Sequence, residues 1–154
     1  MDMIAGSFGP WGPRMGVGER SEAVRFGRDV ELVALHLPAE ARPGDTITIS
    51  YAWRAVRPLP ADYFASVEFR TKEARRPFGH AHRMGGTFGT SRWPSGERVE
   101  EQITVVIPED TAPGPYRVRV AVSAPGHVQR LRVGDADLPH GERFATVGTL
   151  ILTP

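Results

Sequence analysis

The chain has 154 residues, no cysteine and a formal net charge of +1, with 40% hydrophobic and 24% charged residues. This length suits one domain that buries a sizeable core, and the missing cysteines exclude disulfides and thiolate chemistry. The near-neutral charge argues against a nucleic-acid partner. No apolar run approaches the roughly 18 residues that a membrane-spanning helix needs. The first residues lack the basic and apolar regions of a signal peptide.

The first 22 residues are rich in Gly and Pro and have no hydrophobic period. We expect residues 1–22 to form an extended arm and residues 23–154 to form the folded domain.

From residue 23 onward, apolar and polar residues alternate with a period of two, which is typical of half-buried strands. The expected strands are Ala23–Phe26, Val30–Leu37, Thr46–Arg54, Tyr63–Thr71, Val99–Ile107, Tyr116–Ser123, Val128–Val133 and Phe144–Thr153. The stretch Phe78–Gly96 is the least regular. No segment keeps a helical period over three turns, so the pattern predicts an all-β, antiparallel, Ig-like or jelly-roll-like sandwich of about seven to nine strands.

The clearest alternation lies in Tyr116–Ser123, where Tyr116 starts a row of inward-facing residues. Its hydroxyl is expected to bond to nearby backbone, as in a tyrosine corner. Arg117 and Arg119 face outward in the same strand and, with Arg70, could form a basic stripe. We expect them instead to pair across strands with Glu68 and its neighbours. Trp53 lies on the apolar side of its strand and is expected in the core.

Ten short elements along the chain resemble a known family. They are Phe26-Gly27, Val30-Glu31-Leu32, Arg42-Pro43-Gly44-Asp45, Tyr51-Ala52-Trp53-Arg54-Ala55, Pro58-Leu59, Asp62-Tyr63, Gly86, Thr90-Ser91-Arg92-Trp93-Pro94-Ser95-Gly96-Glu97, Ile107-Pro108 and Ala112-Pro113-Gly114-Pro115-Tyr116-Arg117-Val118. Together they are similar to the soluble β-sandwich domains appended to some bacterial multi-spanning membrane glycosyltransferases and related cell-surface proteins. The resemblance covers about residues 24–153 and departs from the family at Phe78–Met84, where such domains are acidic and contain proline. It implies an extracytoplasmic sandwich near a glycan-handling machine, with no catalytic residues to transfer.

The aromatic residues near position 90 are the best ligand candidates. Trp93 stands in a loop between Arg92 and Pro94, with Phe88 close by in the sequence. The indole either plugs the end of the sandwich or offers a stacking surface to a sugar ring, with Arg92 bonding to hydroxyls or carboxylates.

The pair His80 and His82 is the strongest metal-binding signal in the sequence. Alternate residues of a strand point the same way, so both imidazoles can face one ion, and Met84 continues the register in a way that suits copper. Two ligands do not make a site, and a third would have to come from one of the distant histidines, His36, His127 or His140. The alternative is a polar loop with solvated imidazoles.

Glu97, Glu100 and Glu101 form a small acidic group. A glycosidase needs two carboxylates at a fixed separation across a cleft, and neighbours on one strand do not provide it. We therefore expect a solvated strand edge, and no G-x-S-x-G motif suggests a nucleophile elsewhere. The sequence does not favour an enzyme, and it indicates no cofactor.

Three functions remain open. The first is a non-catalytic, extracytoplasmic accessory module that binds a glycan or a partner protein. The second is an assembly subunit that docks through its N-terminal arm or its strand edges. The third is a small metal-binding protein built on His80 and His82.

Overall fold

The computed structural model describes residues 19–71, 73, 78–125, 130–134 and 143–154, and only the backbone of residues 19–22. Within these ranges the chain forms nine β-strands and one short 3-10 helix, η1. Their bounds are β1 (Glu19–Phe26), β2 (Val30–His36), β3 (Glu40–Ala41), β4 (Thr46–Ala55), β5 (Phe64–Arg70), β6 (Phe78–Arg83), η1 (Thr90–Arg92), β7 (Arg98–Val106), β8 (Gly114–Ser123) and β9 (Ala145–Leu152). None of the described residues belongs to a helix with the length and hydropathy that crossing a bilayer requires.

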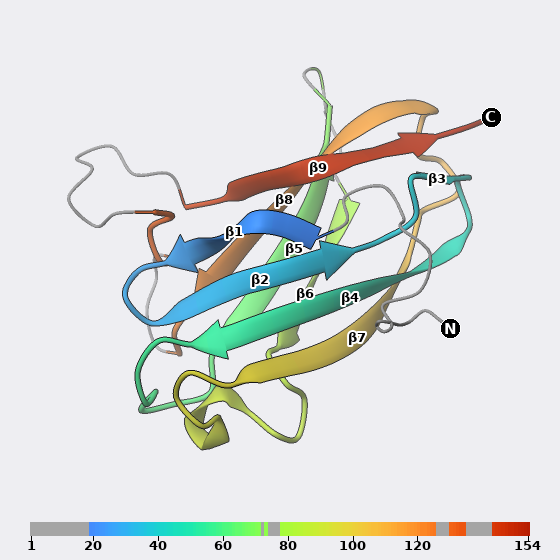
Figure 1. The fold of residues 1–154 in the computed structure, drawn as a ribbon. Helices are drawn as coiled ribbons and strands as arrows, with labels where there is room; N and C mark the ends of the chain where they lie inside the picture. The colour runs from blue at the N-terminus through green and yellow to red at the C-terminus, as the bar shows by residue number, and fades with distance from the viewer. Residues whose placement is uncertain (1–18, 72, 74–77, 126–129, 135–142) are drawn as a thin grey trace.

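The strands form two sheets, which appear as a front and a back layer in Figure 1. Sheet A has the order β1-β2-β4-β7, and sheet B has the order β3-β9-β8-β5-β6. Pairing among the described strands is antiparallel, except that β3 runs parallel to β9. The predicted all-β, antiparallel sandwich is confirmed apart from the parallel β3–β9 pair, whereas its assignment to an Ig-like or jelly-roll-like type stays a prediction.

The inward rows of the strands form one core between the sheets. From β4, β5 and β8 the core takes Ile47, Ile49, Tyr51, Trp53, Ala65, Val67, Phe69, Tyr116, Val118, Val120 and Val122. Burial of each large side chain stabilises the fold by roughly 1.5–3 kcal/mol, so these rows determine which face of each strand turns inward. The Tyr116 hydroxyl donates a hydrogen bond of 2.6 Å to the Ala112 carbonyl, as predicted.

Three local features differ from the expectation. Strand β1 begins at Glu19, four residues before the predicted start, and the rest of the predicted arm lies outside the described residues. The irregular stretch contains a strand, β6, which pairs with β5 along its whole length. Among residues 130–133 there is no continuous strand, and Val133 makes only an isolated bridge to Phe26.

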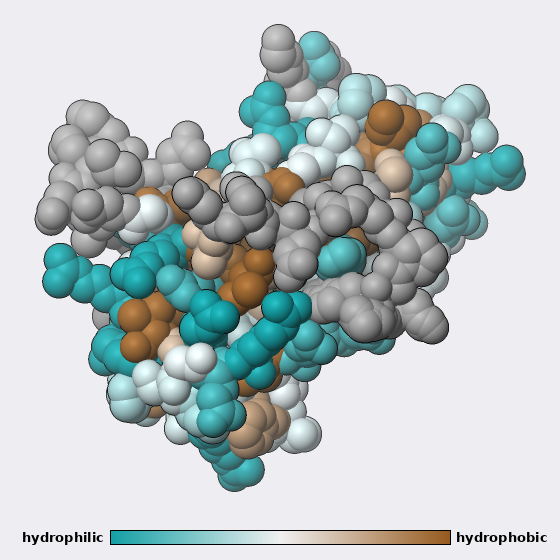
Figure 2. Space-filling view, viewed as in Figure 1, coloured by the Kyte–Doolittle hydropathy of each residue, from teal (hydrophilic) through white to brown (hydrophobic). Residues whose placement is uncertain are grey.

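The outer face of sheet A, onto which Figures 1 and 2 look, carries charges of both signs. Glu31 accepts hydrogen bonds from Arg25 (3.0 Å) and Arg54 (3.3 Å). Arg98 donates to Glu100 at 2.9 Å. Figure 2 shows hydrophilic side chains over much of the described part of this face, with hydrophobic patches between them. These three arginines therefore all have carboxylate partners.

Two glycines allow close approaches that a side chain would prevent. Gly79 in β6 lies so near β5 that an added Cβ would stand 2.3 Å from the Val67 carbonyl oxygen. Gly85, which follows β6, has a φ of 78°, and a Cβ there would meet the Phe88 carbonyl oxygen at 2.2 Å. Both positions therefore need glycine, which places β6 and the turn after it tightly against the body.

Candidate functional site

The three predicted ligand residues in the loop around η1 differ in their exposure to solvent. Trp93 is only 4% exposed, and its Nε1 donates a hydrogen bond of 2.7 Å to the Phe88 carbonyl. The Phe88 side chain is 46% exposed, and Arg92 is also exposed. Trp93 thus packs as a plug at the end of the sandwich, and its buried ring offers little surface to a sugar.

The same loop is held to the body by Asp62. One of its carboxylate oxygens accepts hydrogen bonds from the Ser91 hydroxyl (2.6 Å) and the Ser91 backbone N–H (3.1 Å). These bonds favour the charged carboxylate, so they hold the pKa of Asp62 below its ordinary value. Thr90 adds a second tie, because its buried hydroxyl donates to the Ala61 carbonyl at 2.7 Å.

The two candidate metal ligands lie side by side on β6 but have different surroundings. Their rings are stacked with centroids 6.1 Å apart, and His80 is exposed. The His82 Nε2 lies 2.8 Å from a Glu101 carboxylate oxygen, and its Nδ1 is buried without a hydrogen-bond partner. In the part of the chain that the structure describes, no group of three or more His, Cys, Asp or Glu side chains is arranged to hold a metal ion.

Glu101 is the centre of a buried polar cluster between the sheets. Besides contacting His82, its carboxylate accepts hydrogen bonds from Trp53 Nε1 (2.8 Å) and from the Gly85 backbone N–H (2.9 Å). Glu97 and Glu100 are exposed as expected, but the prediction of a solvated edge is wrong for Glu101, whose side chain is 10% exposed. Glu101 belongs to the inward-facing row of β7, so its carboxylate faces Trp53 on β4 and His82 on β6.

Tyr51 borders this cluster and has an unusual environment. Its ring stacks on Trp53 with centroids 5.3 Å apart and lies 5.4 Å from the His82 ring. The hydroxyl is buried without a hydrogen-bond partner among the described residues. Burial, and then the nearby Glu101 charge, raise the pKa of Tyr51 well above its ordinary value. The cluster is enclosed, so it joins the sheets rather than offering a surface to a ligand.

The outer face of sheet B contains a hollow of about 320 Å³, which we call the sheet B hollow. It is lined by Ser66, Val67, Glu68, Phe78, Gly79, His80, Ala81, Arg130 and Phe144. Gly79 and Ala81 stand opposite Glu68 and Ser66 across the β5–β6 pair, so small residues leave room beside a carboxylate and a hydroxyl. This hollow therefore lies over paired strands and contains a hydroxyl and a partly buried carboxylate, whose side chain is 22% exposed.

Arginines surround one aromatic ring at this hollow. The guanidinium carbons of Arg119 and Arg130 lie 4.7 Å and 4.8 Å from the centroid of the Phe144 ring. Glu68 forms ion pairs with Arg119 at 3.1 Å and with Arg70 at 3.6 Å, which confirms the predicted cross-strand pairing for Arg119. Cation–π contacts and ion pairs restrict these guanidinium groups to defined positions. Arg117 makes no ion pair with a described carboxylate, so the predicted pairing is wrong for that residue.

Sequence reasoning missed most of this hollow. Alternation placed Glu68 and Arg119 on the outside, but nothing in the sequence placed Arg130 and Phe144, which come from segments after β8 and before β9. The hollow forms only because the folded chain brings those two segments beside β5 and β6. The predicted residues Trp93, Arg92 and Phe88 lie in a different part of the chain and do not line it.

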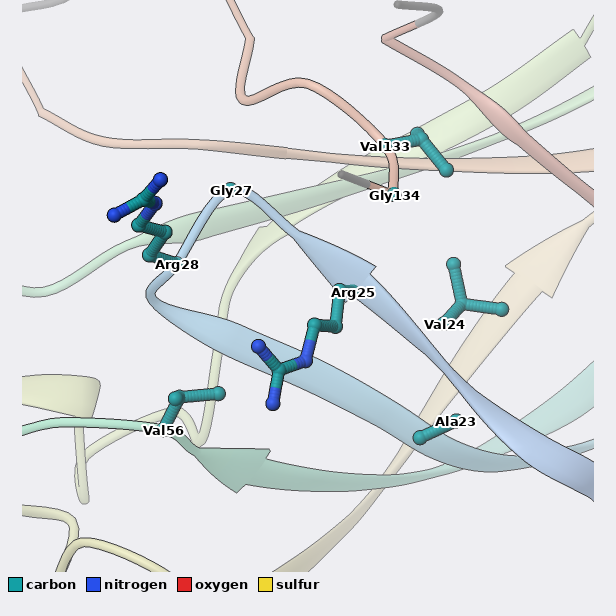
Figure 3. A pocket seen from close by; sticks show the side chains of 8 residues that line it. All are labelled: Ala23, Val24, Arg25, Gly27, Arg28, Val56, Val133 and Gly134. Carbon is teal, nitrogen blue, oxygen red and sulfur yellow. The ribbon is translucent and has the colours of Figure 1, made fainter. Parts of the chain in front are cut away.

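A second, larger hollow of about 660 Å³ lies where β1 turns into β2 (Figure 3). Its lining consists of Ala23, Val24, Arg25, Gly27, Arg28, Val56, Val133 and Gly134. Figure 3 shows that these residues come from β1, the turn after it, the end of β4 and the segment at residues 133–134. Arg25 is already bound to Glu31, and none of the described lining residues has a carboxylate or a hydroxyl, so these residues offer fewer groups for polar recognition.

No protein-family model and no curated protein sequence matches the chain. Among solved structures, the C-terminal domain of Wzt is similar, with a TM-score of 0.51 and 12% identity over 89% of this chain and 81% of that one. An alkylpurine DNA glycosylase, AlkC, of Pseudomonas fluorescens bound to DNA containing an abasic site analogue has a TM-score of 0.42 at 16% identity, covering 85% of this chain and 30% of that one. A β-glucosidase of Listeria innocua has a TM-score of 0.40 at 17% identity, covering 80% of this chain and 16% of that one. At 12% identity, the similarity to the Wzt domain shows a shared β-sandwich fold, and attachment to a glycosyltransferase stays a prediction.

Proposed function

We propose that this chain is a non-catalytic glycan-binding module whose ligand occupies the sheet B hollow. The observation that carries this proposal is the presence of the Glu68 carboxylate and the Arg130 guanidinium around space left by Gly79 and Ala81. Sugars present hydroxyl groups around an apolar ring, and such groups bind best to charged hydrogen-bonding partners beside small apolar surfaces.

The position of the hollow on paired strands supports this role. Ser66 and Glu68 belong to β5, which is hydrogen-bonded on both sides, to β6 and to β8. Their backbone is therefore ordered before any ligand arrives, which lowers the entropy that binding would otherwise lose.

The presence of one carboxylate among the described lining residues favours binding over hydrolysis. A glycosidase generally needs two carboxyl groups about 5–9.5 Å apart. Among the described residues that line the hollow, Glu68 is the only carboxylate, and it is paired with Arg119 and Arg70. The extracytoplasmic location that the family resemblance implies is part of the same proposal.

Affinity electrophoresis in gels that contain neutral or acidic polysaccharides tests the proposal. We expect at least one polysaccharide to retard the chain, and we expect Ala81→Tyr to abolish the retardation because the new ring fills the hollow. Thr48→Tyr is the control, since Thr48 is exposed on β4, in the other sheet. Retardation by none of the glycans, or equal retardation of the Ala81→Tyr variant, would contradict the proposal, and circular dichroism verifies that both variants are folded.

A further inference from the structure

The two outer faces of the sandwich differ in how their arginines are neutralised. On sheet A, the arginines Arg25, Arg54 and Arg98 each contact a carboxylate. Two carboxylates, Glu31 and Glu100, therefore serve three arginines there, and the charges nearly balance.

Around the sheet B hollow, the balance shifts to positive charge. In the part of the chain that the structure describes, Arg70, Arg117, Arg119 and Arg130 stand near one carboxylate, that of Glu68. Among the described residues, Glu68 contacts Arg70 and Arg119, and no carboxylate contacts Arg117 or Arg130. The whole chain has a net charge of only +1, so this face departs from the average of the protein.

The strand register makes this arrangement unfavourable without a partner. Arg70 on β5 stands directly opposite Arg117 on β8. On sheet A, Arg54 and Arg98 are also directly opposed, but each of these two contacts a carboxylate. Like charges at directly opposed positions of an antiparallel pair destabilise the sheet, and Arg70 lies 3.6 Å from its nearest carboxylate. An anion bound over the Arg70–Arg117 pair would relieve the repulsion.

Arg130 is placed to contact such an anion at the hollow itself. Its guanidinium carbon lies 4.8 Å from the centroid of the Phe144 ring, and this cation–π contact holds the group beside the hollow. A guanidinium fork matches the spacing of two oxygens of a carboxylate or a sulfate, and it binds them with charge-assisted hydrogen bonds.

We infer that the ligand of the sheet B hollow is an anionic glycan, one whose sugars carry carboxylate or sulfate groups. This inference rests on the proposed function and adds the chemical class of the ligand. The sugar ring occupies the hollow over Gly79 and Ala81, and the anionic group contacts Arg130 and the Arg70–Arg117 pair.

Affinity electrophoresis of the full chain against three polymers tests the inference. The polymers are polygalacturonate, which carries carboxylates, dextran sulfate, which carries sulfates, and neutral dextran. The double variant Arg117→Gln/Arg130→Gln removes two charges from this face, and Arg54→Gln/Arg98→Gln removes two charges from sheet A as a control. We expect retardation by at least one acidic polymer, weakened roughly tenfold or more in the first double variant and less than about twofold in the control.

The outcomes separate the inference from the proposed function. The acidic polymer that binds identifies the group, carboxylate or sulfate. Binding of neutral dextran with equal or higher affinity would overturn the inference and leave glycan binding intact. An equal loss in both double variants would also overturn it, because the attraction would then depend on net charge alone. Retardation by none of the polymers would contradict both.

Discussion

The imidazole Nε2 of His82 lies 2.8 Å from a carboxylate oxygen of Glu101, and this contact joins the last strand of sheet B to the last strand of sheet A. Both side chains are about nine-tenths buried. Because β6 and β7 end their sheets on the same side, the pair closes an edge that the sandwich would otherwise leave open.

Removing the Glu101 carboxylate should therefore destabilise the fold. Glu101→Ala leaves the buried donors of Trp53 and Gly85 without acceptors, and each orphaned donor costs roughly 1–3 kcal/mol. We expect a loss of about 3 kcal/mol in the free energy of unfolding, measured by urea denaturation. Glu101→Gln, which keeps one acceptor oxygen, should lose less.

Glu100→Ala is the matched control, since Glu100 precedes Glu101 in the sequence and its side chain is 53% exposed and faces outward. It should change the stability by less than about 0.5 kcal/mol. Equal effects of the two alanine substitutions would refute the central position of Glu101.

Tyr63 should make the protein sensitive to alkaline pH. Its hydroxyl donates to Asp29 at 2.9 Å, and burial together with this bond raises its pKa to about 12 from an ordinary value of 10.0. The unfolded chain then loses the phenolic proton first, so the stabilisation is complete below about pH 10 and falls as pH rises toward about 12.

Thermal unfolding of wild type and Tyr63→Phe, recorded between about pH 8 and pH 11, measures this effect. The wild type should lose more stability over that interval than the variant, because phenylalanine has no proton to lose. Parallel curves would show that Tyr63 does not contribute to the alkaline transition.

The lowered pKa of Asp62 predicts that the protein loses stability at acid pH. The Ser91 hydrogen bonds lower its pKa, so its contribution is present above the ordinary value of 3.8 and is lost as pH falls through the lower, folded-state value. Ser91→Ala should reduce the acid sensitivity of the unfolding midpoint. An unchanged acid slope in that variant would argue against the Asp62–Ser91 bonds.

Trp93 should behave as a core residue rather than a ligand contact. Trp93→Ala removes a ring that is 4% exposed, and we expect a loss of roughly 3–5 kcal/mol in the free energy of unfolding. Phe88→Ala removes a ring that is 46% exposed and should cost much less. If Trp93→Ala left stability intact but reduced glycan retardation, the indole would be a ligand contact after all.

The strand rows that pack into the core were predictable from the sequence, since alternation in β4, β5 and β8 depends on neighbours two residues apart. Trp53 and Tyr116 occupy the positions that this period assigns to them. Strand β6 was not predictable in the same way, because Gly79 and exposed polar residues such as His80 at a sheet edge leave no apolar row to detect.

The candidate site was much less predictable. Glu101 is buried because donors from two other strands converge on it, and no local pattern reports such contacts. Similarly, Phe144 meets Arg119 and Arg130 only through the fold. Local periodicity determines which face of a strand turns inward, but not which distant segment comes to cover it.

The most direct measurement is an NMR titration of the ¹⁵N-labelled chain with an oligogalacturonate. We predict that the largest amide shifts fall on Ser66, Glu68, Gly79, Ala81 and Phe144, with little change at Thr48 on the other sheet. Shifts confined to the loop at Phe88–Trp93 or to the outer face of sheet A would contradict glycan binding at the sheet B hollow.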